Sequence, residues 1–145
     1  RHGATTDTAL RYIDFAARYG FNGVLIEGWN VGWDGDWFGN GEEFSFTQPY
    51  PDFDLERVAA YARERGVRII GHHETSANAA HYENQMEAGF ALYQRLGVRV
   101  VKTGYVSDAA GARVNAQDGH VRFAWHEGQE LARHHLRVVQ TAARY

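Results

Sequence analysis

The amino-acid sequence predicts an α/β fold with a parallel sheet, and three observations support this prediction. A helical pattern, a glycine and an apolar run follow one another three times along the chain. The apolar runs are continuous rather than alternating, which is typical of strands buried on both faces. Helices of this length between the runs supply the crossover that parallel pairing requires.

The first unit has the sequence "ALRYIDFAARYGFNGVLIEGWN". Its helix is expected to be capped by Thr6 or Asp7 and to stop at Gly20. An apolar run over residues 24–26 then predicts a strand, and Glu27 follows it directly.

The second unit, "DLERVAAYARERGVRIIGHHETS", repeats this order. Asp54 is the expected N-cap of its helix, Gly66 the expected C-cap, and residues 67–70 the expected strand. His72 and Glu74 come directly after this strand. Reactive side chains at the C-terminal end of a buried strand are the usual layout of an α/β enzyme.

The third unit has a helical face formed by Tyr82, Met86, Phe90 and Tyr93. Gly97 is expected to stop this helix and residues 98–101 to form the strand, which Lys102 follows. A more polar insertion comes next. A fourth helix is predicted from roughly Phe123 to Tyr145, with His126, His134 and His135 at surface positions.

The number of repeats suggests part of a larger barrel. The letters "AARY" occur at 16–19, before the first strand, and again at 142–145, where a fourth strand is expected to follow. We therefore predict a partial (β/α)8 TIM barrel with about three of its eight parallel strands and flanking helices. Residues 1–145 are expected to be a fragment of a single catalytic barrel, without the other domains of a longer protein.

The composition excludes several classes of function. The chain has 145 residues, of which 44% are hydrophobic, so it can bury a core. Its 15 Lys and Arg residues are scattered among 18 Asp and Glu residues, which argues against nucleic acid as a partner. The longest apolar runs are far shorter than the roughly 20 residues that span a bilayer, so no membrane partner is expected. The absence of cysteine excludes a disulfide framework and a thiolate metal site.

Parallel strands bring their C-terminal ends to one rim, so polar residues that are distant in sequence should meet there. Glu74 could act as a general base or a nucleophile. His72 could donate to a substrate hydroxyl or bind a metal. Lys102 needs a carboxylate or a polyhydroxyl ligand, and an ion pair with Glu27 is expected. Because successive side chains of a strand alternate, His72 and His73 cannot both face one site, and one of the two is expected to be structural.

Several motifs taken together resemble the catalytic barrel of glycoside hydrolase family 97. They occur in the same order and spacing as in that family and cover nearly the whole chain: "YIDFAARYGFNGVLIEGWNVGW", "WFG", "PYPDFDL", "GVRIIGHHETS", "ENQMEAGF" and "VKTGY". The resemblance implies a (β/α)8 barrel between two β domains, with a calcium ion in the full-length enzyme. It also implies a secreted or periplasmic bacterial enzyme that cleaves α-linked glucosides.

The resemblance also implies a mechanism. Retaining members of the family carry an aspartate nucleophile where this chain has Gly104, and inverting members have glycine there. The chain is therefore similar to the inverting branch, in which the glutamate of "HHE", here Glu74, is a general base. Contacts to sugar hydroxyls carry over to Glu27, His72 and Lys102. The general acid and most calcium ligands of the family lie beyond the matched stretch, so the fragment alone is expected to be inactive.

Two other functions stay open from the residues alone. The first is a metal-dependent TIM-barrel isomerase or aldolase that uses His72, Glu74 and Glu27 as ligands. The second is a non-catalytic carbohydrate-binding domain whose aromatic loop grips a sugar. That loop carries three tryptophans within nine residues: Trp29, Trp33 and Trp37.

Overall fold

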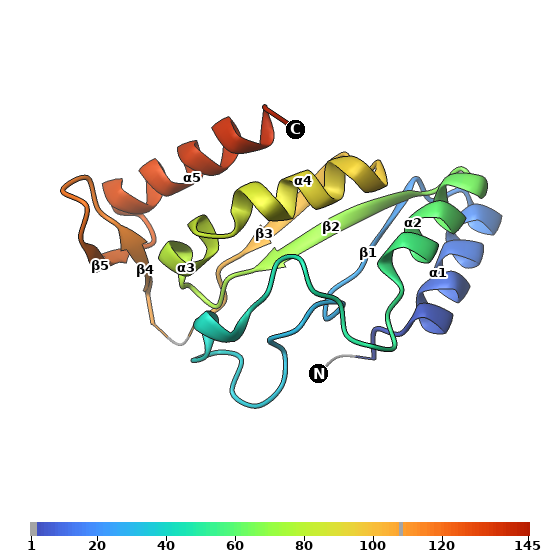
Figure 1. Ribbon diagram of the computed structural model, residues 1–145, viewed down its shortest axis with the longest axis horizontal. Helices are drawn as coiled ribbons and strands as arrows, with labels where there is room; N and C mark the ends of the chain where they lie inside the picture. The colour runs from blue at the N-terminus through green and yellow to red at the C-terminus, as the bar shows by residue number, and fades with distance from the viewer. Residues whose placement is uncertain (1–2, 108) are drawn as a thin grey trace.

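The computed structural model describes residues 3–107 and 109–145 and has a three-stranded parallel sheet at its centre (Figure 1). The strand order is β1 (Gly23–Leu25), β2 (Arg68–Glu74) and β3 (Val100–Gly104). Both strand pairs are parallel. The predicted α/β class and parallel sheet are therefore confirmed.

The strands β2 and β3 extend further toward their C-terminal ends than the apolar runs predicted, whereas β1 ends at Leu25, one residue before the end of its predicted run. In β2 the last three residues, His72 to Glu74, pair with Lys102 to Gly104 of β3. The residues expected just after these strands are thus held within the hydrogen-bonded sheet. The backbone of the sheet, and not a loop, sets their positions.

The helices of the first two units, α1 (Thr6–Tyr19) and α2 (Leu55–Glu64), begin and end close to the predicted residues. The single helix predicted for the third unit is divided into two, α3 (Ala79–Glu83) and α4 (Met86–Leu96), and α5 (Gln129–Ala142) follows. The N-cap of α2 is Asp54, as predicted, and its side chain accepts the N–H of Arg57. The N-cap of α1 is Thr5 rather than Thr6 or Asp7, because the Thr5 hydroxyl accepts the N–H of Thr8.

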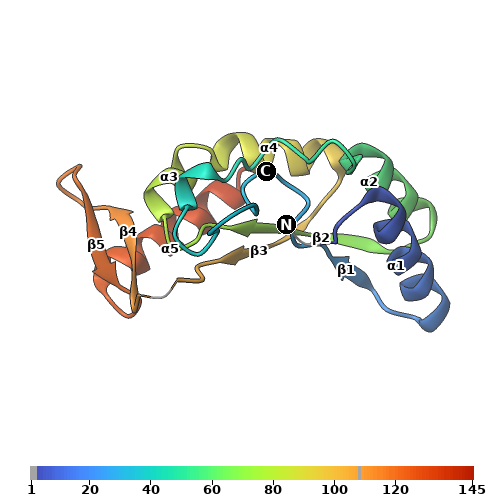
Figure 2. The same cartoon turned by 90° about the horizontal axis from the view of Figure 1, so that it is seen from below.

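The helices α1, α2 and α4 pack beside or above the strands, and the opposite face of the sheet is open among the described residues (Figure 2). The covered face carries the main core, which includes Ile13, Val58 and Ile69. On the open face, Leu25 and Val100 are 38% and 45% exposed. In a closed (β/α)8 barrel the helices lie outside and the other face of the sheet lines the interior, so the open face is the barrel-interior face.

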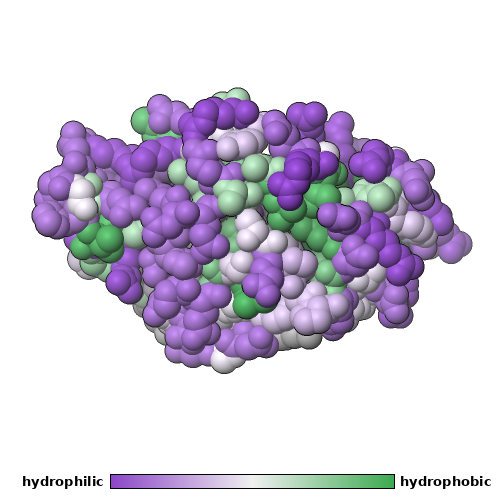
Figure 3. All heavy atoms as spheres, in the orientation of Figure 1, coloured by the Kyte–Doolittle hydropathy of each residue, from purple (hydrophilic) through white to green (hydrophobic). Residues whose placement is uncertain are grey.

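The surface of the helices agrees with this arrangement. In the space-filling view the face that carries the helices is largely hydrophilic, and hydrophobic atoms show mainly near its middle (Figure 3). In the described part of the chain, no helix combines the length and the apolar composition that crossing a membrane requires.

The start of the predicted fourth helix is wrong. Residues from Phe123 to Trp125 belong to strand β5 (Val121–Trp125), which pairs antiparallel with β4 (Gly111–Asn115). This hairpin and α5 lie together at one end of the molecule (Figure 1). The expected polar insertion after β3 therefore contains a strand of its own.

Candidate active site

The four predicted site residues meet on the open face of the sheet, at the C-terminal ends of the strands. In β2 and β3, His72 lies opposite Lys102, and Glu74 lies opposite Gly104. The carboxylate of Glu27, just after β1, accepts a hydrogen bond of 2.9 Å from Lys102 Nζ and lies 3.7 Å from His72 Nε2. The prediction that these strand ends converge is confirmed, as is the predicted Glu27 to Lys102 ion pair.

Glu74 is buried and firmly held. The residue is only 3% exposed. The backbone N–H groups of Ser76 and Val106 both donate to Glu74 Oε1 at 2.9 Å. Ser76 and Ala77, which follow it, have φ angles of 48° and 53°, a conformation that L residues seldom adopt and that is found most often at functional sites. The backbone around this carboxylate is therefore shaped to orient it.

Burial raises the pKa of the Glu74 carboxyl above its usual range. The N–H donors of Ser76 and Val106 and the positive charge of Lys102 act in the opposite direction. Carboxyl groups with such competing influences can change their protonation state near the pH at which an enzyme works. Glu74 therefore has the environment expected of a proton-transferring group.

Gly104 leaves the space that the Glu74 carboxylate fills. A Cβ atom built on Gly104 would lie 1.8 Å from Glu74 Oε2 and 2.7 Å from Glu74 Cδ. These two residues are direct neighbours across β2 and β3. A larger residue at position 104 is thus incompatible with Glu74 in this place.

His72, Glu27 and Lys102 form a polar set beside Glu74. His72 is 2% exposed, whereas the side chains of Glu27 and Lys102 are 38% and 52% exposed. The set therefore presents a donor and an acceptor to the open face, with an imidazole behind them. Such a combination suits hydrogen bonding to a polyhydroxyl ligand.

His73 is the one of the two histidines that points to the helix side of β2. Its ring stacks on Tyr93 at 4.8 Å between centroids, and its Nδ1 lies 2.9 Å from the Tyr82 hydroxyl. Burial, aided by the charge of His72, lowers the pKa of His73 to about 3, so the ring is neutral near pH 7. We assign it a structural role in the core.

Two of the three tryptophans in the aromatic loop are buried. Trp29 and Trp33 are each 2% exposed. Trp33 packs edge-on against Phe44 and stacks near His72, with centroid distances of 5.2 and 5.9 Å. Trp37 is half-buried and stacks on Phe38. The three rings therefore do not form one exposed surface, which weakens the argument for a carbohydrate-binding domain.

The described residues hold no group of three or more His, Cys, Asp or Glu side chains that could bind a metal ion. His72, Glu74 and Glu27 therefore do not form the ligand set that a metal-dependent isomerase or aldolase requires.

A second polar cluster was missed by the sequence reasoning. His134 was expected on the surface, but its side chain is fully buried. Its Nδ1 lies 2.6 Å from Glu83 Oε1, and its Nε2 lies 2.7 Å from the Tyr105 hydroxyl. Glu83 is 51 positions away from His134, so no local pattern could have shown this contact.

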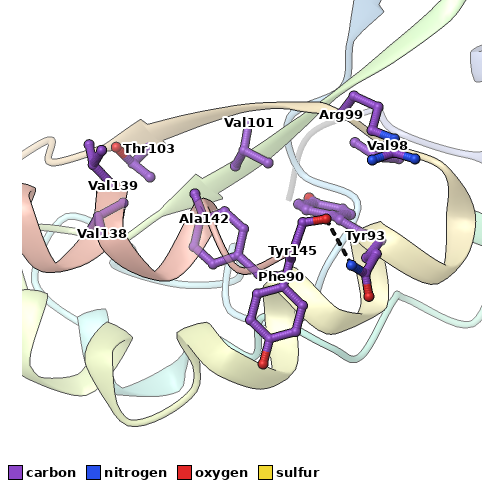
Figure 4. Close-up of a pocket in the computed structure, with 11 residues that line it drawn as sticks. Phe90, Tyr93, Val98, Arg99, Val101, Thr103, Val138, Val139, Ala142 and Tyr145 are labelled. Atoms are coloured by element: carbon purple, nitrogen blue, oxygen red, sulfur yellow. Dashed lines mark hydrogen bonds between the residues drawn. The ribbon is translucent and has the colours of Figure 1, made fainter.

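A separate cavity lies away from these residues. It measures about 370 Å³ and lies between α4, β3 and α5, on the helix side of the sheet (Figure 4). Its lining is mainly apolar, from Phe90, Val101 and Val138 among others. Because it contains no carboxylate, we place the chemistry at Glu74 rather than in this cavity.

The chain matches known proteins over almost its whole length. The family model for glycoside hydrolase 97 matches residues 1–145. A family 97 enzyme from Pseudoalteromonas sp. strain K8, solved in complex with acarbose, is 52% identical with a TM-score of 0.91. A variant of a family 97 enzyme from the same strain, solved in complex with panose, has the same identity and TM-score. In both cases the match covers 99% of this chain and 22% of the solved chain.

Proposed function

The chain belongs to glycoside hydrolase family 97, and on that basis we propose that it forms part of the catalytic barrel of an inverting enzyme that hydrolyses α-linked glucosides. The enzymes of this family have a TIM-barrel catalytic domain. The chain spans about a fifth of the solved chains that it matches. Activity is therefore assigned to the barrel of which these strands are a part.

The observation that carries the proposal is the placement of Glu74 against Gly104. Retaining glycosidases use two carboxyl groups about 5 to 5.5 Å apart, one of them a nucleophile, whereas inverting enzymes use a base that activates water. At position 104 a nucleophilic aspartate would overlap with the Glu74 carboxylate. The two strand ends thus accommodate one carboxylate, which supports its use as a base.

Glu74 is suited to take a proton from water. Both backbone N–H donors bind its Oε1. We therefore assign its Oε2, which lies over Gly104, to the attacking water. The positive charge of Lys102 favours the ionised carboxylate that a general base needs.

The neighbouring polar residues are suited to hold the sugar. In this proposal Lys102 Nζ donates to sugar hydroxyls and the Glu27 carboxylate accepts from them, while His72 fixes the orientation of Glu27. The acarbose and panose complexes of the family 97 enzymes show that relatives bind oligosaccharides. An oligosaccharide or α-glucoside is thus the proposed ligand.

The remaining parts of the machinery are proposed to lie outside residues 1–145. Within a complete barrel, β1 and β3 would each pair with a further strand at the edges of this sheet. The apolar cavity beside β3 is suited to receive side chains of the next strand. The general acid, the calcium ligands and the secretion of a bacterial enzyme are carried over from the family as proposals, and residues 1–145 alone are proposed to be inactive.

Glu74→Gln in the natural full-length protein tests the proposal. The substitution keeps the size of the side chain but removes the base, so kcat on an α-glucoside should fall about 10²- to 10⁴-fold. Binding of panose, measured by isothermal titration, should stay within a few fold. Activity near that of the wild type would overturn the proposal.

A further inference from the structure

We propose that Tyr105, His134 and Glu83 form a positioning triad that holds the Val106 N–H against Glu74 and so fixes the orientation of the catalytic carboxylate. The inference rests on the proposed role of Glu74 as a base. None of the three residues is assigned a contact with substrate.

The triad begins next to the catalytic carboxylate. Val106, whose N–H donates to Glu74 Oε1 at 2.9 Å, is 43% exposed and lies beyond the end of β3. Its position therefore depends on how the chain is anchored after Gly104. The preceding residue, Tyr105, supplies an anchor because its hydroxyl lies 2.7 Å from His134 Nε2 and its ring packs edge-on against His134 at 5.4 Å.

Several hydrogen bonds hold Glu83, the third residue of the triad, in place. Glu83 Oε1 contacts His134 Nδ1 at 2.6 Å and accepts two hydrogen bonds from Arg137, at 2.7 and 2.9 Å. Glu83 Oε2 accepts a hydrogen bond of 2.9 Å from Asn115. The carboxylate thus joins α3, α5 and β4 at one point, and His134 on α5 carries that fixed position to Tyr105.

The protonation states determine the direction of the hydrogen bonds. Burial would raise the pKa of Glu83, but the hydrogen bonds from His134, Arg137 and Asn115 outweigh it and lower the pKa to about 2. The ionised carboxylate accepts a hydrogen bond from His134 Nδ1–H, and His134 Nε2 faces the Tyr105 hydroxyl. Burial raises the pKa of Tyr105 to about 12, so its hydroxyl keeps its proton.

This arrangement predicts a specific consequence for Glu74. The Val106 N–H favours the ionised form of Glu74, as does the nearby charge of Lys102, whereas burial disfavours it. His72 and Glu27 of the polar set also lie on this face of the sheet. Tyr105 is a further titratable group close to Glu74, and its raised pKa keeps it neutral near pH 7. Loss of the Tyr105 anchor should therefore both misorient Glu74 and raise its pKa.

Two variants of the natural full-length protein separate positioning from simple packing. Tyr105→Phe removes only the hydroxyl. His134→Asn keeps a nitrogen near the place of Nδ1 and loses the contact with Tyr105. Tyr61→Phe, which removes a hydroxyl bonded to Asp14 far from the site, is the matched control.

The expected results are kinetic. On an aryl α-glucoside, Tyr105→Phe and His134→Asn should each lower kcat about 10-fold with KM within about twofold, because misplaced catalytic groups act on the transition state. The acid limb of the kcat/KM profile should move to higher pH in both. Tyr61→Phe should leave kcat and the acid limb near those of the wild type.

The double variant Tyr105→Phe/His134→Asn should be no slower than the slower single variant, because both changes break the same link. If Tyr105→Phe leaves kcat and the acid limb unchanged, the triad is refuted, even if the melting temperature falls. This variant alone decides the question if His134→Asn fails to fold. Loss of activity in Glu74→Gln together with an unchanged Tyr105→Phe enzyme would leave the base role intact. Retained activity in Glu74→Gln would refute the base role itself.

Discussion

Gly104→Ala tests the geometry of the base most sharply. The added methyl would lie 1.8 Å from Glu74 Oε2, 2.7 Å from Cδ and 3.3 Å from Oε1. Carbon and oxygen atoms that are not bonded seldom approach closer than about 3 Å, so the carboxylate must move by about 1 Å or more. Such a shift would stretch the two bonds of 2.9 Å that Oε1 accepts from Ser76 and Val106.

The expected loss follows from this displacement. A misplacement of about 1 Å in a catalytic group can cost about 100-fold in rate, so kcat on an aryl α-glucoside should fall roughly 10²- to 10³-fold. Overpacking of a buried site costs a further 1 to 3 kcal/mol, roughly, in the free energy of unfolding. Steady-state kinetics and urea denaturation of the natural full-length protein measure the two effects.

Two controls make this prediction specific. Gly3→Ala is a matched change, because a Cβ there meets no atom within 4 Å. In a Glu74→Ala background, Gly104→Ala should cost little further stability, because the carboxylate that it displaces is gone. A kcat for Gly104→Ala within about threefold of the wild-type value would refute the inferred overlap with Glu74.

The remaining predictions concern charge. Activity should be lost as the pH falls through the raised pKa of Glu74. Lys102→Met should move this acid limb of kcat/KM to still higher pH, because it removes a positive charge that lowers the pKa of Glu74. A move of the limb to lower pH would contradict this reasoning. Glu83→Gln should destabilise the protein by roughly 3 kcal/mol at neutral pH, because a carboxyl whose pKa is lowered from 4.5 to about 2 stabilises the folded state above pH 4.5. Urea denaturation should show that this difference shrinks as the pH falls from 4.5 toward 2, and a constant difference would refute the assigned ionisation.

Periodicity predicted the repeated units because helix amphipathicity, caps and glycine stops are local properties. Asp54 caps α2 as expected, and the apolar faces of α1 and α4 are buried. The length of β2 was not predicted, since His72 and Glu74 are polar and are strand residues only because β3 pairs with them. Pairing between distant segments thus decided where the strand ends.

The β4–β5 hairpin had a local signal that was overlooked. Asp118 and Gly119 form the type of dipeptide that closes hairpins, and Gly119 has a φ of 83°. The following residues, Val121, Phe123 and Trp125, alternate with other residues as in a strand. A helical interpretation over this segment was therefore avoidable.

The candidate site was predicted in part. The convergence of Glu27, His72 and Lys102 follows from parallel topology alone. The contacts of His134 do not, because its partners Glu83 and Tyr105 come from other segments. Its burial had a local signal, because Leu131, His134 and Val138 recur at helical spacing on the buried face of α5.

The configuration of the first sugar released tests the central claim most directly. Proton NMR can follow the anomeric signals while the natural full-length protein hydrolyses an α-glucoside, before mutarotation mixes them. If the Glu74 carboxylate activates water across from Gly104, the first product is the β-anomer. Initial release of the α-anomer would show a double displacement and contradict the role assigned to Glu74.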